Sequence, residues 1–131
     1  KGMIARVKHT LWLIEQLRPT YWVLENPFGL LRHMEFMKKH IMVEVTYCQY
    51  GDQERMKPTD LWGRFPRSFK ARRCSYGSRC HPATPRSKPQ VGTQGMDYDR
   101  KVRIPFGLSK AIFDACVLSW PEAYFTLEDF A

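Results

Sequence analysis

The chain has 131 residues and a formal net charge of +8, and 44% of its residues are hydrophobic. This length and composition are typical of one globular domain with a single core. No apolar run approaches the ~20 residues that cross a bilayer. No charged-then-apolar leader is present either, so we expect a cytoplasmic, intracellular protein without a membrane partner. The excess of Lys and Arg favours a polyanionic partner, usually nucleic acid, although a merely basic surface is the alternative.

Residues 3–18 are predicted to form a helix. Apolar side chains recur there at steps of three and four residues, which places them on one stripe. The helix is expected to end before Pro19, because the residue that precedes a proline avoids the helical region. The stripe consists of Ile4, Val7, Leu11, Ile14 and Leu17.

Three later segments have the character of strands. Residues 21–25 form an apolar run that a proline soon stops, and residues 42–47 alternate apolar and polar side chains. Residues 59–65 follow a turn at 50–52, so we expect them to pair antiparallel with the preceding strand. Between the first two strands, residues 28–39 are predicted to form a turn and a short helix.

The second half of the chain changes character. Residues 66–100 are rich in proline and glycine, and no acidic residue occurs between Leu61 and Met96. Long loops of this kind are usually functional or disordered. Residues 105–118 return to a helical pattern, and the acidic stretch 122–129 is interpreted as a docking segment.

Three short motifs follow one another along the chain. The first strand ends in Glu25-Asn26-Pro27, and the carboxyl ends of strands are where open α/β sheets bind ligands. A turn at Tyr50-Gly51 is followed by Gln-x-Arg-x-Lys, and Arg103-Ile104-Pro105 leads into the last helix. In this order and spacing, the motifs resemble the later motifs of the DNA (cytosine-5) methyltransferases.

The match has specific departures. Pro27 stands where that family has Val, Lys57 stands where it has the last Arg, and one residue is missing between Gly51 and Gln53. The family's glycine-rich cofactor loop and its Pro-Cys-Gln nucleophile loop lie upstream of Glu-Asn and are not found in this sequence. The resemblance therefore implies the C-terminal half of such an enzyme, of phage or mobile-element type. It would be inactive alone, and a missing N-terminal half or second subunit would complete it.

The resemblance covers most of residues 3–118 and implies an α/β fold. The expected architecture is a partial methyltransferase-type, Rossmann-like sheet with flanking helices, a β-hairpin and a long basic loop. Within one domain, residues 1–65 would supply the sheet, 66–100 a basic loop in the place of the family's target-recognition region, and 101–131 the last helix and tail.

The resemblance also implies roles for individual residues. Glu25 would hold the N3 and amine edge of a cytosine that has left the base stack, and Asn26 would help to fix that loop. Arg55 would steady the nucleophile loop and the base, and Gln53 would anchor its own turn. The alternative is that Glu25 and Asn26 cap the next helix and that Arg55 is a solvated turn charge. The cofactor would be S-adenosylmethionine, whose site would lie mostly outside this chain and be lined here by Arg103, Ile104 and Pro105.

Cationic side chains are spread through the loop that follows the third strand. In this arrangement they could follow a phosphate backbone, which would make binding of DNA depend strongly on salt. The alternative is a flexible, solvated loop. The candidate DNA-binding residues are Arg64, Arg67, Lys70, Arg72, Arg73, Arg79, Arg86 and Lys88.

Cysteine and histidine residues in the same loop form a candidate metal site. Cys74, Cys80 and His81 lie close together in the sequence, and Cys48 could be a fourth ligand from the second strand. A tetrahedral zinc site with three Cys and one His ligand would tie down a loop that has little core of its own. The alternative is that the cysteines are small buried apolar residues or exposed thiols.

The sequence thus supports three hypotheses. The chain is a partial cytosine-5 methyltransferase, a non-catalytic nucleic-acid-binding module stabilised by zinc, or an inert truncated domain. A sheet that lacks neighbouring strands has an unpaired edge, so self-association of the isolated chain is expected.

Overall fold

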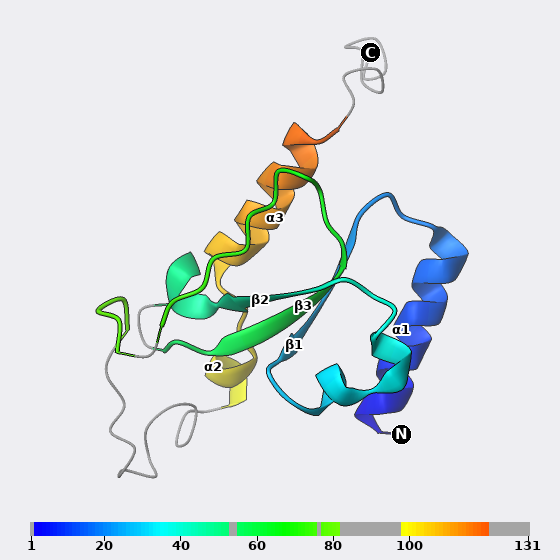
Figure 1. The fold of residues 1–131 in the computed structure, drawn as a ribbon, viewed down its shortest axis with the longest axis horizontal. Helices are drawn as coiled ribbons and strands as arrows, with labels where there is room; N and C mark the ends of the chain where they lie inside the picture. Colours follow the sequence, from blue (N-terminus) through cyan, green and yellow to red (C-terminus); the bar gives the residue numbers. More distant parts are fainter. Residues whose placement is uncertain (1, 53–54, 76, 82–97, 121–131) are drawn as a thin grey trace.

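The computed structural model describes residues 2–52, 55–75, 77–81 and 98–120. The chain has a mixed α/β architecture in which helices flank a three-stranded sheet (Figure 1). The elements, in order, are α1 (Met3–Leu17), β1 (Trp22–Pro27), η1 (Leu30–His33), η2 (Glu35–Met37), β2 (Met42–Thr46), η3 (Tyr47–Tyr50), β3 (Pro58–Arg64), α2 (Tyr98–Val102) and α3 (Phe106–Leu118), where η denotes a 3-10 helix.

The sheet has the order β1-β3-β2, and β3 is antiparallel to both of its neighbours. Leu61 in the central strand pairs with Glu25 on one side and with Val43 on the other. The predicted antiparallel pairing of the second and third strands is therefore confirmed. The Rossmann-like character of a larger sheet stays a prediction, because the described sheet contains only antiparallel pairs.

One face of the sheet packs on α1. The buried side chains there come from α1, η1, η2 and β3, namely Leu11, Leu31, Met37 and Trp62. The helix ends as predicted, since Arg18 adopts the left-handed conformation (φ 48°) and its N–H donates to the carbonyl of Ile14. The short helix expected in residues 28–39 is instead two 3-10 turns.

The opposite face packs on α3 and on η3. Its core contains Val45, Tyr47, Tyr50, Leu61 and Leu108. Gly107 brings the first turn of α3 against η3, because a Cβ at this position would lie 2.3 Å from the carbonyl oxygen of Tyr50. The sheet is therefore a layer between two helices (Figure 1).

The segment after β3 is ordered by contacts rather than by regular structure. Residues 65–75 and 77–81 contain neither helix nor strand. The Ser68 hydroxyl donates to the carbonyl of Ala115 in α3 (2.8 Å), and the Thr46 N–H donates to the carbonyl of Arg72 (3.2 Å). The predicted loop does not extend to residue 100, because α2 begins at Tyr98. Residues 76 and 82–97 of that loop and the acidic stretch lie outside the described residues. No helix in the described part of the chain combines the length and apolar character needed to span a membrane.

Candidate metal centre and carboxylate site

Four potential metal ligands meet beside β2. The Sγ atoms of Cys48, Cys74 and Cys80 and the nearer ring nitrogen of His81 all lie within 4.8 Å of one another. Cys48 comes from η3, while the others come from the segment after β3. These four residues could hold a metal ion, and they are the set that the sequence predicted.

The distances within the cluster are near those around a tetrahedral ion, and only the Cys48 and Cys74 sulfurs would have to move apart, by about 0.7 Å. Zinc bound to thiolates at about 2.3 Å has neighbouring sulfurs about 3.8 Å apart. Cys48 Sγ lies 3.1 Å from Cys74 Sγ and 3.6 Å from Cys80 Sγ. His81 Nδ1 lies 3.7 Å from Cys74 Sγ and 3.4 Å from Cys80 Sγ. All four cysteines of the chain are free thiols, and the adjacent residues Cys80 and His81 both face the cluster.

Hydrogen bonds from β2 and η3 place the ligands. The backbone N–H of Cys74 donates to Thr46 Oγ1 (2.9 Å), and Gln49 Nε2 donates to Cys80 Sγ (3.3 Å). The backbone N–H of Arg72 donates to the Tyr50 hydroxyl (2.9 Å). Residues that surround the ligands in this way orient them and tune the site.

The thiols of the cluster differ in acidity. Burial, followed by its hydrogen bond with Cys74, raises the pKa of Cys48 to about 12. At Cys74 burial acts in the same direction, but hydrogen bonds with Cys48, Thr46 and Cys80 outweigh it and lower the pKa. Of these two thiols Cys74 therefore ionises first, and an incoming cation would have to displace the proton of Cys48.

A second site lies at the carboxyl end of β1, on the face that packs against α3. Glu25 Oε1 accepts a hydrogen bond from the hydroxyl of Tyr47 (2.8 Å). The Tyr47 side chain is buried, and burial together with the Glu25 charge raises the pKa of its hydroxyl. Tyr47 is therefore a neutral donor that holds one oxygen of the carboxylate.

Arg55 reaches the same tyrosine from the turn before β3. Its guanidinium lies 5.9 Å from the centre of the Tyr47 ring, and its Nε donates to Asp52 Oδ2 (2.7 Å). The Arg55 side chain is 7% exposed, so it is not a solvated turn charge. It also donates to the carbonyl of Arg103 (3.4 Å), the first residue of the predicted cofactor segment.

Lys57 is the second cation beside the ring of Tyr47. Its Nζ lies 4.4 Å from the centre of the Tyr47 ring, and its backbone has a positive φ of 33°. Burial lowers the pKa of its ammonium group, against the effect of the Glu25 charge. The Tyr47 ring therefore carries a carboxylate at its hydroxyl and two cations near its face.

Asn26 fixes its own turn. Its Nδ2 donates to the carbonyl of Pro27 (2.9 Å), and strand alternation places it on the opposite face from Glu25. The alternative that Glu25 and Asn26 cap the next helix is wrong. The N-cap residue of η1 is Gly29, and no side chain makes a capping hydrogen bond there. Gln53 lies outside the described residues.

The predicted DNA-binding residues are exposed but not equivalent. Arg72 stacks on the ring of Tyr50, with 4.3 Å between its Cζ and the ring centre, and Arg73 pairs with Glu44 (2.9 Å). Arg86 and Lys88 lie outside the described residues. The other exposed members of the set are Arg64, Arg67, Lys70 and Arg79.

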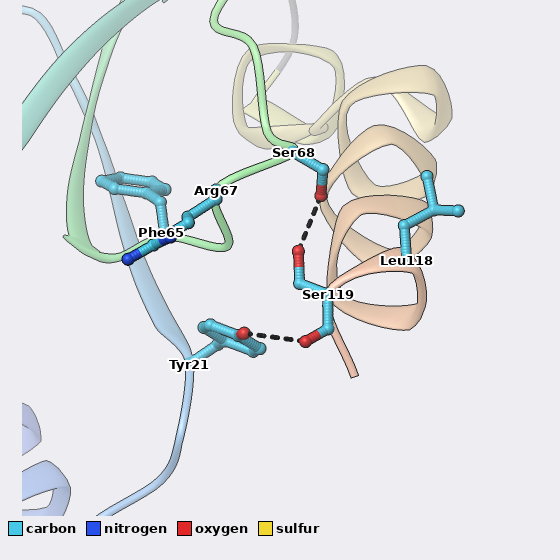
Figure 2. A pocket seen from close by; sticks show the side chains of 6 residues that line it. All are labelled: Tyr21, Phe65, Arg67, Ser68, Leu118 and Ser119. Carbon is cyan, nitrogen blue, oxygen red and sulfur yellow. Dashed lines mark hydrogen bonds between the residues drawn. The ribbon is translucent and has the colours of Figure 1, made fainter. Parts of the chain in front are cut away.

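A pocket at the other end of the sheet includes one of these arginines. Arg67 and Phe65 face Tyr21 and the end of α3 (Figure 2). The Tyr21 hydroxyl donates to the carbonyl of Ser119 (3.3 Å). The cavity has a volume of about 590 Å³ and does not include the predicted cofactor residues, of which Arg103 and Ile104 are exposed.

Sequence reasoning missed two features of the site. The sequence pattern predicts Tyr47 only as one of the alternating apolar residues of a strand, although its hydroxyl contacts Glu25. Asp60 is fully buried and accepts hydrogen bonds from Arg32 at both carboxylate oxygens, and Arg32 also pairs with Glu44 (3.1 Å). A charged residue inside the predicted third strand was the available signal, since buried carboxylates need a partner.

Comparisons with protein-family models, with curated proteins and with solved structures found no match to this chain.

Proposed function

We propose that this chain is the base-holding and DNA-binding portion of a DNA (cytosine-5) methyltransferase, stabilised by a structural zinc ion. The observation that carries the proposal is the meeting of Glu25 and Arg55 on one side chain, Tyr47. These residues belong to two separate motifs of the resemblance. A carboxyl group and a guanidinium at one strand end are what a site for an extruded pyrimidine requires.

Glu25 has the geometry for its proposed role. Its Oε1 is held by Tyr47, while no hydrogen bond to Oε2 is found within the described residues. When protonated, this second oxygen would donate a hydrogen bond to N3 of cytosine, which makes C6 electrophilic. Arg55 is held by Asp52 and by the Arg103 carbonyl, so it would keep the turn and residues 103–105 together beside the base.

The methyl donor, S-adenosylmethionine, would supply an electrophilic methyl group. Arg103, Ile104 and Pro105 fit at most one wall of its site, since the first two are exposed. The sequence has no Pro-Cys-Gln segment, and Cys48, Cys74 and Cys80 belong to the metal cluster. The attacking thiolate and the rest of the cofactor site would therefore belong to polypeptide outside these 131 residues.

Zinc is the metal that the ligand set favours. Three thiols and one imidazole at tetrahedral spacing are typical of a closed structural site. The ion would join η3 to residues 74–81, a segment without helix or strand in its described part. Exposed cations on the preceding residues would then contact DNA phosphates from a fixed position.

The test is equilibrium binding of the zinc-loaded chain to duplexes that carry cytosine or thymine opposite an abasic site. Such a base is already unpaired, so extrusion costs little. We expect a preference for cytosine of about tenfold, within the about 1–3 kcal/mol of a good base contact. Glu25→Ala should remove the preference, whereas Glu35→Ala, on an exposed carboxylate, should keep it. Equal binding of both bases by the parent chain would contradict the proposal.

A second candidate is a non-catalytic nucleic-acid-binding module, favoured by the link between the metal cluster and the basic segment. This candidate predicts salt-dependent DNA binding without preference for cytosine. It also predicts that Glu25→Ala leaves the relative affinities for cytosine and thymine unchanged. The same experiment therefore separates the two candidates.

A further inference from the structure

The Cys/His cluster (Cys48, Cys74, Cys80 and His81), here called the metal cluster, and the carboxylate site share one short element, η3. Tyr47 contacts Glu25, and the next residue, Cys48, is a potential metal ligand. Because the two residues are consecutive, any bond that fixes the backbone of Cys48 also restricts Tyr47.

Other residues of η3 also contact the segment that supplies the remaining ligands. Gln49 donates to Cys80 Sγ, and the Tyr50 hydroxyl accepts from the N–H of Arg72. Tyr47 is held independently by its N–H, which donates to the carbonyl of Met56 (2.8 Å). The side chains of residues 48–50 thus all face the segment that a metal ion would order.

We propose that Tyr47 is a positioning residue for Glu25, and that metal binding at the cysteine cluster sets the position of the Tyr47 hydroxyl through η3. This inference rests on the proposed function and adds to it a metal-dependent control of base recognition. With the metal bound, the hydroxyl holds Oε1 of Glu25 and directs Oε2 toward the base. Without it, η3 loses the fixed point at Cys48 and the carboxylate loses its orientation.

The test compares the parent chain with Tyr47→Phe, each with zinc and after chelation. Tyr47→Phe removes only the hydroxyl and keeps the buried ring. If the two sites are coupled through this hydroxyl, the effects of the variant and of chelation are not additive. Chelation should reduce the cytosine-over-thymine preference of the parent from about tenfold to about twofold. In the variant the preference should be about twofold in both states.

Linkage provides a second measurement on the folded, zinc-loaded protein, in case chelation unfolds the chain. Duplex with an unpaired cytosine should raise the zinc affinity of the parent more than duplex with a thymine does, by the same factor by which zinc raises the cytosine preference. In Tyr47→Phe the two duplexes should raise the zinc affinity equally. The same difference between the duplexes in both proteins would overturn the proposal.

A readout without DNA separates this inference from the proposed function. The ¹³C NMR signal of the Glu25 carboxyl should move when zinc is added to the parent and stay in place in Tyr47→Phe. If neither protein prefers cytosine but this difference is present, the coupling stands and the proposed function fails. A Glu25 signal that responds to zinc equally in both proteins, or in neither, would overturn the coupling.

Discussion

The two candidate sites lie on either side of η3 and are built in different ways. The carboxylate site uses a strand end, a buried tyrosine and a turn, so the sheet itself fixes its donors and acceptors. The metal cluster takes three of its four ligands from a segment without regular structure. Regular structure builds the first site, and the proposed coupling would act on it only through η3, whereas an ion would be needed to order the backbone of the second. This difference predicts which changes the protein tolerates.

The largest effect is expected from removing a metal ligand. Cys80→Ser should abolish stoichiometric zinc binding, because structural zinc sites in peptides contribute apparent free energies of about 10–16 kcal/mol. Metal analysis of the purified protein and its melting temperature measure the loss. Cys116→Ser is the matched control, since Cys116 lies in α3 outside the cluster. Equal zinc content in parent and Cys80→Ser would exclude the proposed ligand set.

A large effect is also expected in the buried ion pair of the sheet. Arg32→Ala would leave Asp60 buried without its guanidinium partner, which should lower the free energy of unfolding by about 3 kcal/mol. Urea denaturation measures this change. Lys38→Ala, which removes an exposed pair with Glu35, should change stability by less than about 0.5 kcal/mol. A similar loss in both variants would show that Arg32 has no special role.

A moderate effect is expected from the basic segment. Replacing Lys70 or Arg79 by Ala should reduce the steepness of log affinity for DNA against log salt by about 1 for each phosphate that the side chain neutralises. Arg73→Ala should reduce it less, because Arg73 pairs with Glu44. Binding titrations at several salt concentrations give the slopes. A slope that none of the three substitutions changes would place the phosphate contacts elsewhere.

The smallest effect concerns the remaining thiol. Burial raises the pKa of Cys116, so less thiolate is present at pH 8 than in a free cysteine. In the zinc-loaded protein, alkylation of Cys116 should therefore be slower than that of glutathione, and its rate should keep rising above the pH at which the glutathione rate levels off. Mass spectrometry after timed alkylation follows both. Equal rates and pH profiles would contradict the effect of burial.

Much of this architecture could be predicted from the sequence because local patterns specify it. The stripe of α1 and the alternation in β2 each predicted the correct element, and proline and glycine marked the turns. The grouping of Cys48, Cys74, Cys80 and His81 as candidate metal ligands was also predicted, because Cys and His are the usual ligands of structural zinc. The contact between Tyr47 and Glu25 could not be predicted, because it joins β1 to the first residue of η3 across the central strand β3. Cross-strand contacts of this kind depend on register, which no local pattern specifies here.

Under the proposed function Glu25 would contact N3 of cytosine, so the most direct measurement observes that atom. A duplex with an unpaired cytosine labelled with ¹⁵N at N3 would be bound to the zinc-loaded chain and studied by NMR. We predict a large shift of the N3 signal with the parent chain and none with Glu25→Ala. An N3 signal that moves equally with both proteins, or with neither, would contradict the claim.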